Sequence, residues 1–171
     1  MQGYVQVYTG DGKGKTTAAL GLAIRAAGAG LKVFIAQFFK IGEYSEIKSL
    51  KKHSEFIKLE QFGRGRFRQG KPFPEDIESA RVGLERVRAV MNSDKYNVVI
   101  LDEANVAVWK GLFPEKELLE IIEMRPIKIE LVITGRGATS KVIEKADLVT
   151  EMKVIKHYFY SGVRGRVGIE K

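Results

Sequence analysis

Short apolar runs alternate with longer stretches of helical periodicity along most of this chain. The apolar runs are rich in Val, Ile and Leu and predict strands at residues 4–8, 32–37, 55–59, 97–101 and 128–134, with an edge strand near 148–151. The stretches between them predict helices at residues 15–28, 44–51, 74–93, 114–124 and 139–145. Alternation of this kind is typical of a parallel sheet covered by helices on both faces.

The order of these elements reads as successive βα units, which predicts an α/β fold with three α/β/α layers and a mostly parallel sheet. Residues at the expected boundaries agree with this order. Gly28 and Gly30 suit the end of the first helix, and Pro74 and Pro114 suit a first helical turn. A chain of 171 residues, 44% of them apolar, is long enough for one well-buried core, so we expect a single domain over residues 1–171.

Composition restricts the chemistry that is available. The chain has no cysteine, which excludes disulfides, thiolate metal sites and cysteine nucleophiles. The two histidines, His53 and His157, are far apart in sequence, so a metal is expected to have oxygen ligands. Residues 1–8 run into a strand without a basic and apolar leader, and no apolar stretch reaches the roughly 20 residues that span a bilayer. These features predict a cytoplasmic protein without a membrane partner.

The net charge of +8 predicts attraction to anions, but it does not choose among nucleic acid, membrane surfaces and small polyanions. Part of this charge lies in residues 61–71, where Arg64, Arg66, Arg68 and Lys71 stand without an acid. Such a run is either a solvated loop or a site where arginine and aromatic side chains stack on the bases of a single strand. The segment is single and short, which argues against nucleic acid as the partner.

A glycine-rich turn follows the strand at residues 4–8 at once and leads into a helix. It consists of Thr9, Gly10, Asp11, Gly12, Lys13, Gly14, Lys15, Thr16 and Thr17. A helix that opens with Gly-Lys-Thr after such a turn is typical of polyphosphate binding, because glycines let backbone N–H groups point inward and the helix N-terminus adds positive potential. Lys15 would neutralise phosphate oxygens, and the Thr16 hydroxyl would bind magnesium. A glycine turn without a ligand is disfavoured by the strand, the spacing and the lysine together.

The loop departs from the usual phosphate-loop pattern at its first position. The common spacing places glycine or alanine where this chain has Thr9, and counting from Gly10 makes the loop one residue short. Either difference changes how a phosphate chain lies in the loop. Ordinary transfer of the terminal phosphate is therefore not assumed.

A second anchor is the apolar run at residues 97–101, which ends in Asp102 and Glu103. In phosphate-loop proteins an acid at this position supports magnesium, directly or through water. Adjacent strand residues point to opposite faces, so one of the two carboxylates is expected to face the metal, and the pattern does not say which. A solvated strand end is the alternative.

Several segments over nearly the whole chain resemble the P-loop type of ATP:corrinoid adenosyltransferase. They are TGDGKGKTTAA at residues 9–19, AQFFK at 36–40, VILDE at 99–103, VITGR at 132–136, ADLVTEM at 146–152, VIKH at 154–157 and GIE at 168–170. The resemblance implies a P-loop NTPase fold of the RecA-like kind. It also implies that ATP binds the loop in the reverse sense and that Co(I) of a corrinoid attacks C5′ of the ribose and expels tripolyphosphate.

The resemblance implies roles for particular residues. The triphosphate would be held by the loop, from Thr9 to Thr17, and Thr16 would share magnesium or manganese with Asp102 or Glu103. Lys15 and Thr16 would thus act at the reaction itself. Further family positions near the nucleotide, with no firm role, are Arg25, Gln37 and Lys40. Arg136 would contact polyphosphate or form a structural salt bridge.

The resemblance also assigns the segment from Phe62 to Phe73 to the corrinoid. Relatives place aromatic side chains there against the lower face of the corrin, where they exclude the axial ligand and make Co(II) easier to reduce. We expect Phe67, and after it Phe62, to act in this way. The family further implies a cobalamin or corrinoid substrate, an electron donor such as a flavoprotein reductase, and a homodimer. The tail after His157 is a candidate to close the corrinoid site.

Other conspicuous residues are better explained by structure. Trp109 is predicted to pack in an apolar stretch, and His53 to lie on the surface. Leu118, Leu119, Ile121 and Ile122 have helical spacing and are predicted core. His157 either ligates cobalt, binds phosphate or is a hydrogen-bonded structural residue. Within phosphate-loop enzymes, a kinase or ATPase is the alternative function, and it would release ADP or phosphate.

Overall fold

The computed structural model describes residues 2–64 and 71–170. The strands are β1 (Val5–Thr9), β2 (Val33–Gln37), β3 (Ile57–Gln61), β4 (Val98–Asp102), β5 (Glu130–Thr134) and β6 (Leu148–Glu151). The α-helices are α1 (Lys15–Gly28), α2 (Ser45–Leu50), α3 (Pro74–Met91), α4 (Ala104–Trp109), α5 (Glu115–Met124) and α6 (Ser140–Lys145). Two short 3-10 turns, η1 (Lys51–His53) and η2 (Tyr158–Ser161), complete the described elements.

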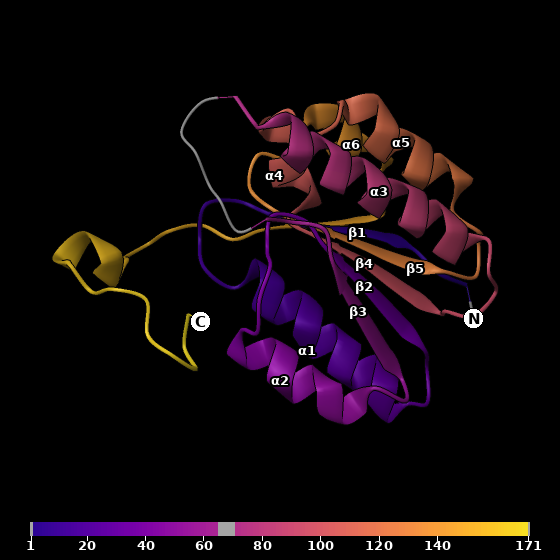
Figure 1. The fold of residues 1–171 in the computed structure, drawn as a ribbon, viewed down its shortest axis with the longest axis horizontal. Coiled ribbons are helices and arrows are strands. Elements are labelled where there is room, and N and C mark those ends of the chain that lie inside the picture. The colour runs from indigo at the N-terminus through magenta and orange to yellow at the C-terminus, as the bar shows by residue number, and fades with distance from the viewer. Residues whose placement is uncertain (1, 65–70, 171) are drawn as a thin grey trace.

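The strands form one sheet in the order β3-β2-β4-β5-β1-β6, and every pairing is parallel. Figure 1 shows α1 and α2 on one face of this sheet and α3, α4, α5 and α6 on the other. The predicted three-layer α/β/α architecture with a parallel sheet is therefore confirmed. The edge strand expected near 148–151 is β6.

Successive residues of the central strands contribute to two separate cores, because side chains alternate between the faces of a sheet. In β4, Val99 and Leu101 join the core under α3 to α6, while Val98 and Ile100 join the core under α1 and α2. The next residue in this alternation, Asp102, is fully buried on the α1 side. The alternation thus directs a carboxylate toward the helix that follows the glycine turn.

Two differences from the predicted elements have local causes. The third strand begins at Ile57 rather than at residue 55, because the 3-10 turn η1 carries the chain on to Phe56, whose N–H bonds to the carbonyl of His53. The short helix α4 directly after β4 was not predicted. It ends at Trp109, which the sequence predicted to be packed. This prediction is wrong, since Trp109 is 59% exposed, with the Lys110 ammonium 4.1 Å from its ring centre.

Most other expectations about single residues are confirmed, and that for Pro114 is off by one position. Pro74 opens α3, and Gly30 follows α1 with a φ of 78°. Pro114 lies one position earlier than expected, as the residue that precedes α5. Three of the four predicted core residues of α5 are buried and Leu119 is partly buried, and His53 is exposed.

The segment after β6 is largely exposed and contains η2. In Figure 1 it extends away from the sheet and then turns back, so that the last described residues lie on the side of the α1 N-terminus. Among the described residues, no helix is long and apolar enough to cross a membrane.

Gly3, just before β1, lies in close contact with the residues that precede β5, and substitution of Gly3 can test this packing. The Gly3 N–H bonds to the carbonyl of Ile127 at 2.8 Å, and a Cβ on Gly3 would lie 2.3 Å from the carbonyl carbon of Ile129. We expect Gly3→Ala to lower the free energy of unfolding by about 1–3 kcal/mol, because backbone atoms would have to move. Gly28→Ala, where a Cβ meets nothing within 4 Å, is the control and should be neutral or slightly stabilising, because Gly28 ends α1. Equal urea unfolding midpoints for both variants would contradict this packing.

Candidate functional site

The loop between β1 and α1 requires glycine at several positions. Gly10 and Gly14 have φ values of 90° and 123°, in the region that favours glycine. A Cβ on Gly10 or Gly12 would lie 2.5 or 2.7 Å from the carbonyl oxygen of Met152, just beyond β6. The Gly12 N–H bonds to that same oxygen at 2.6 Å. The loop is thus held flat against the end of β6, and its glycines allow this close approach.

Lys15 folds into the loop that precedes it. Its Nζ donates to the carbonyl oxygens of Gly10 at 2.6 Å and Gly12 at 2.7 Å, and the residue is buried. Burial lowers the pKa of the Lys15 ammonium, and the nearby Arg136 charge lowers it further. The loop therefore contains a partly desolvated cation that would gain from an anionic partner.

Asp102 joins four donors from different parts of the fold. Its Oδ1 accepts hydrogen bonds from the hydroxyls of Thr16 and Thr134, each at 2.8 Å. Its Oδ2 accepts from the amide Nε2 of Gln37 at 3.1 Å and from Lys40 Nζ at 3.2 Å. The carboxylate thereby connects the start of α1 to the carboxyl ends of β2 and β5.

Lys40 provides the charge that balances this buried carboxylate. Burial lowers the pKa of Lys40, but the charge and hydrogen bond of Asp102 outweigh it, so that the net shift is upward. Glu46 of α2 lies 3.7 Å from the same ammonium. Lys40 is therefore a permanent cation at the mouth of the site.

Glu103 occupies an unusual backbone position between β4 and α4. Its φ is 64°, in the left-handed region that a residue with a side chain seldom adopts, and its N–H donates to the Thr134 hydroxyl at 3.0 Å. Burial raises the pKa of the Glu103 carboxyl, and repulsion from Asp102 raises it further. A strained backbone and a partly buried acid are both unfavourable for folding, and such features cluster at functional sites.

These oxygen donors suit a magnesium ion. The Thr16 hydroxyl and Asp102 are in contact, and Glu103 follows in sequence. The described residues contain no group of three or more His, Cys, Asp and Glu side chains that would hold a metal alone. Magnesium commonly takes one or two carboxylates and completes its shell with waters and substrate phosphates, so the donor set fits.

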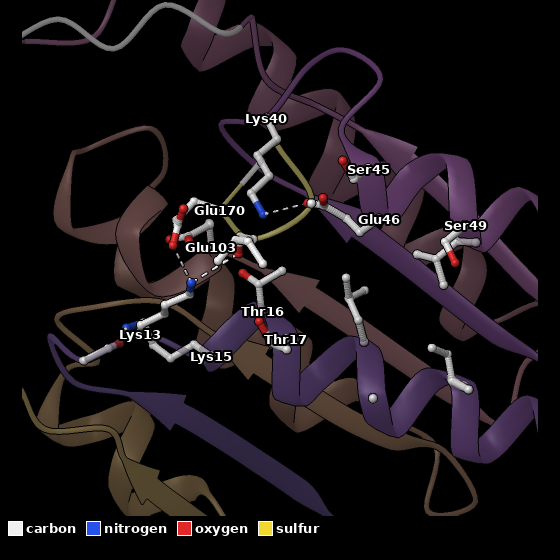
Figure 2. Close-up of a pocket in the computed structure, with 18 of the residues that line it drawn as sticks. Lys13, Lys15, Thr16, Thr17, Lys40, Ser45, Glu46, Ser49, Glu103 and Glu170 are labelled. Atoms are coloured by element: carbon white, nitrogen blue, oxygen red, sulfur yellow. Dashed lines mark hydrogen bonds and ion pairs between the residues drawn. The ribbon is translucent and has the colours of Figure 1, made fainter. Parts of the chain in front are cut away.

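A cavity of about 810 Å³ opens in front of the loop (Figure 2). Of the predicted site residues, those that line it are Asp11, Gly12, Lys13, Gly14, Lys15, Thr16, Thr17, Lys40, Glu103 and Arg136. Asp102 and Gln37 are buried behind them. Thr9 is also buried, and its hydroxyl accepts a hydrogen bond from the Ala138 N–H at 3.3 Å.

The remaining predicted residues lie elsewhere. Arg25 is exposed in the last turn of α1 and is not among the residues that line the cavity. Phe62 is partly buried, with its ring 6.1 Å from that of Phe38. Phe67 lies outside the described residues. Arg136 both lines the cavity and approaches Asp11 at 3.9 Å, so its two expected roles are compatible.

Sequence reasoning missed two walls of the cavity. One is α2, which contributes Ser45, Glu46 and Ser49. The other is the end of the tail, through Gly168, Ile169 and Glu170. The sequence predicts the tail after His157 only as a cover for the corrinoid, although the GIE segment at residues 168–170 is one of the motifs behind the family resemblance. His157, for which the sequence offers binding of cobalt or phosphate as one alternative, also lines the cavity. His157 has a structural hydrogen bond as well, since its Nδ1 accepts from the Phe159 N–H at 3.1 Å.

At Gly21 the wall of the cavity is helix backbone without a side chain. It lies in the middle of α1 and lines the cavity between Leu20 and Ile24, and a Cβ on it would meet no atom within 4 Å. Glycine inside a helix costs roughly 0.5–1 kcal/mol relative to alanine. No neighbour in the protein requires this cost, so the space over Gly21 is available to a ligand.

Together the fold and this site define a P-loop nucleotide-binding protein of the α/β class. Solved structures with the same fold include a KaiC-like protein from Pyrococcus horikoshii, with a TM-score of 0.62 and 15% identity over 91% of this chain and 75% of that one. The RadB recombinase is similar as well, with a TM-score of 0.59 and 14% identity over 91% of this chain and 77% of that one. At such identities the likeness concerns the fold alone.

The family is established by sequence. Residues 1–170 match the family described as ATP:corrinoid adenosyltransferase BtuR/CobO/CobP, and the chain belongs to it. A corrinoid adenosyltransferase of Pseudomonas aeruginosa is 33% identical over 170 residues, covering 99% of this chain and 84% of that protein. One from Escherichia coli K12 is 33% identical over 171 residues, covering 99% and 86%. The resemblance read from the motifs is therefore confirmed.

The burial of Glu103 has a consequence for stability. Because its pKa is raised in the folded state, ionisation of Glu103 opposes folding at neutral pH, and this opposition disappears below the ordinary glutamate pKa of 4.5. We expect Glu103→Gln to raise the free energy of unfolding at pH 7 by on the order of 1 kcal/mol and to lower enzymatic activity. Denaturant unfolding at pH 7 and pH 4, without added metal, measures the first effect. A variant less stable than the parent at pH 7 would contradict it.

The open space over Gly21 allows a test of whether a ligand lies there. We expect Gly21→Ala to be more stable than the parent by up to about 1 kcal/mol, because it removes a helix glycine. Gly21→Leu should fold as well but fill part of the cavity and raise the KM of a substrate at least several-fold. Gly28→Leu is the matched control, since it lies on the same helix with open space and does not line the cavity. Equal KM values for the two leucine variants would exclude a ligand over Gly21.

Proposed function

We propose that this chain transfers the 5′-deoxyadenosyl group of ATP to the Co(I) centre of a corrinoid and releases tripolyphosphate, in the synthesis or salvage of adenosylcobalamin. The triphosphate lies in the loop from Thr9 to Thr17, and C5′ of the ribose faces the cavity. All 171 residues act as a single domain. Family membership supports the reaction, and the geometry of the loop supports the roles of the residues.

The observation that carries this assignment is the 2.8 Å hydrogen bond between the Thr16 hydroxyl and Asp102. It brings the phosphate loop and the acidic end of β4 to one point, beside Lys15 and Lys40. A triphosphate in the loop would therefore meet backbone N–H groups, two ammonium groups and the carboxylates of a magnesium site at once. A glycine turn that binds no ligand would not require these groups to lie together.

The reaction itself asks for little proton chemistry. The electron pair on Co(I) forms the Co–C5′ bond, the C5′–O bond breaks, and its electron pair leaves on the oxygen of tripolyphosphate. No proton is gained or lost at the reacting atoms, so the protein supplies orientation and positive charge around the leaving group. Lys15 stabilises that charge from inside the loop, and Arg136 and Lys40 do so from the cavity wall.

Thr16, Asp102 and Glu103 are the residues that would hold magnesium or manganese. The bound cation would neutralise part of the triphosphate charge. Asp102 is oriented by Gln37 and Thr134, which keep its carboxylate directed at Thr16. Glu103 reaches the same region from the turn after β4.

On the corrinoid side, Phe67 remains our candidate to exclude the lower axial ligand. Phe62 is a weaker one, because its ring already packs beside Phe38. An electron donor such as a flavoprotein reductase, a homodimeric assembly and a cytoplasmic location are proposed from the family resemblance and the sequence. Arg25 belongs to this proposal only as a family position at the far end of α1.

Product analysis tests the proposed function against a kinase or ATPase. With ATP, magnesium and chemically reduced corrinoid, we expect tripolyphosphate and an adenosylated corrinoid in equal amounts, with no ADP. Lys15→Ala should lower the rate by about 100-fold or more, because it removes the cation inside the loop. Lys52→Ala, an exposed site outside the cavity, is the control. ADP as the product, or an unchanged rate for Lys15→Ala, would refute the proposal. ATP-independent, salt-sensitive RNA binding would instead favour the nucleic-acid alternative.

A further inference from the structure

Lys13, the lysine of the phosphate loop that precedes Lys15, is bound to the C-terminal tail. Its Nζ donates to Glu170 Oε1 at 2.8 Å, to Tyr158 Oη at 3.0 Å and to the carbonyl oxygen of Ile169 at 3.1 Å. An ammonium group has three N–H donors, so these contacts use its whole capacity. For Lys13 to bind a phosphate oxygen, at least one contact with the tail has to break.

Glu170 is the anionic partner in this arrangement. Its carboxylate also accepts from the Arg166 backbone N–H at 2.8 Å, from the Arg166 guanidinium at 3.1 Å and from the Tyr158 hydroxyl. Hydrogen bonds from Arg166, Lys13 and Tyr158 hold the pKa of Glu170 well below its ordinary value. Glu170 therefore carries a full negative charge at neutral pH.

This charge lies at the wall of the nucleotide cavity, and Figure 2 marks the contact between Glu170 and Lys13. The basic residues that line the cavity are Lys13, Lys15, Lys40 and Arg136, and the acidic ones are Asp11, Glu46, Glu103 and Glu170. The four positive charges and the four negative charges cancel. The lining therefore has no net positive charge to match a triphosphate, which carries about four negative charges. Loss of the Glu170 charge would leave the lining net positive.

We propose that Glu170 competes with the triphosphate for Lys13 and so limits how tightly the phosphate loop holds ATP and its product. On binding, Lys13 exchanges the tail carboxylate for phosphate oxygen, and the tail is released. When tripolyphosphate leaves, Glu170 takes Lys13 back. This inference rests on the proposed function in one respect, namely that the triphosphate lies in the loop.

The exchange is energetically accessible in both directions. The side chains of Lys13 and Glu170 are 42% and 21% exposed, so water reaches both partners and their ion pair is a weak one. A polyphosphate offers more negative charge than one carboxylate and is favoured for the same ammonium. A replacement anion makes release of the product easier, and Glu170 lies within reach of Lys13 to provide it.

Calorimetric titration of the full chain with inorganic tripolyphosphate and with ATP tests the proposal. We expect Glu170→Gln to bind tripolyphosphate about three- to tenfold more tightly than the parent. The matched control is Glu78→Gln, which makes the same change in charge at an ion pair with Arg81 on α3 and should have no such effect. In a Lys13→Ala background the effect of Glu170→Gln should shrink to the small general effect of removing one negative charge, because there is no ammonium left to compete for.

Three outcomes would overturn the proposal. Weaker or unchanged binding by Glu170→Gln would mean that Glu170 does not compete for Lys13. Equal tightening by Glu78→Gln would assign the effect to net charge, and tightening of undiminished size without Lys13 would exclude this lysine as the shared partner. Adenosyl transfer is scored separately, so tight tripolyphosphate binding with ADP as product would contradict the function alone.

Hydrogen exchange on the unaltered chain provides a second measurement that needs no variant. Saturating tripolyphosphate should speed exchange at the backbone amides of residues 158–170 several-fold, including that of Arg166, which now bonds to Glu170. Slower or unchanged exchange there would show that the tail stays on the loop when the anion binds. That result would also overturn the proposal.

Discussion

The buried Asp102 carboxylate is the interaction on which the rest of this site depends. It receives donors from the start of α1, from the end of β2 and the residues after it, and from the end of β5, so three separate stretches of chain are held against the end of β4. A carboxylate at such depth is tolerable only if it is fully paired. The strand register provides this, because Gln37 pairs with Asp102 and Leu101 with Ile133, which brings Gln37 and Thr134 to either side of the acid. Sheet geometry thus produces the site directly.

The same constraint explains why Glu103 is strained. The chain has to leave β4 immediately after Asp102 in order to start α4, and the left-handed backbone of Glu103 makes that turn. Its carboxyl is thereby returned to the cavity instead of pointing into the opposite core. Stability is lost here at a position where we propose that an acid binds a cation, and such a trade-off is expected at functional sites.

Local patterns predicted most of the fold and the centre of the site. The apolar strands, the glycine turn and the two acids at the end of β4 are each a continuous stretch of sequence. Their physical meaning could therefore be inferred without a structure. The two cavity walls formed by α2 and by the tail could not be predicted in this way. Glu170 meets Lys13 across 157 positions, and Ser45 and Glu46 belong to a short helix without a distinctive pattern. Trp109 was misjudged because its apolar neighbours Ala107 and Val108 gave no sign that the helix ends with its last side chain turned outward.

That outward tryptophan gives the molecule an optical property. Trp109 is the sole indole in the chain, and a Cβ on Gly137 would be 3.4 Å from its ring, so the ring lies beside the loop that carries Arg136. Arg136 in turn borders the nucleotide cavity. Tryptophan emission therefore comes from one solvent-facing indole near this cavity. A change in the position of that loop would alter this emission, which can be recorded in real time without attaching a dye.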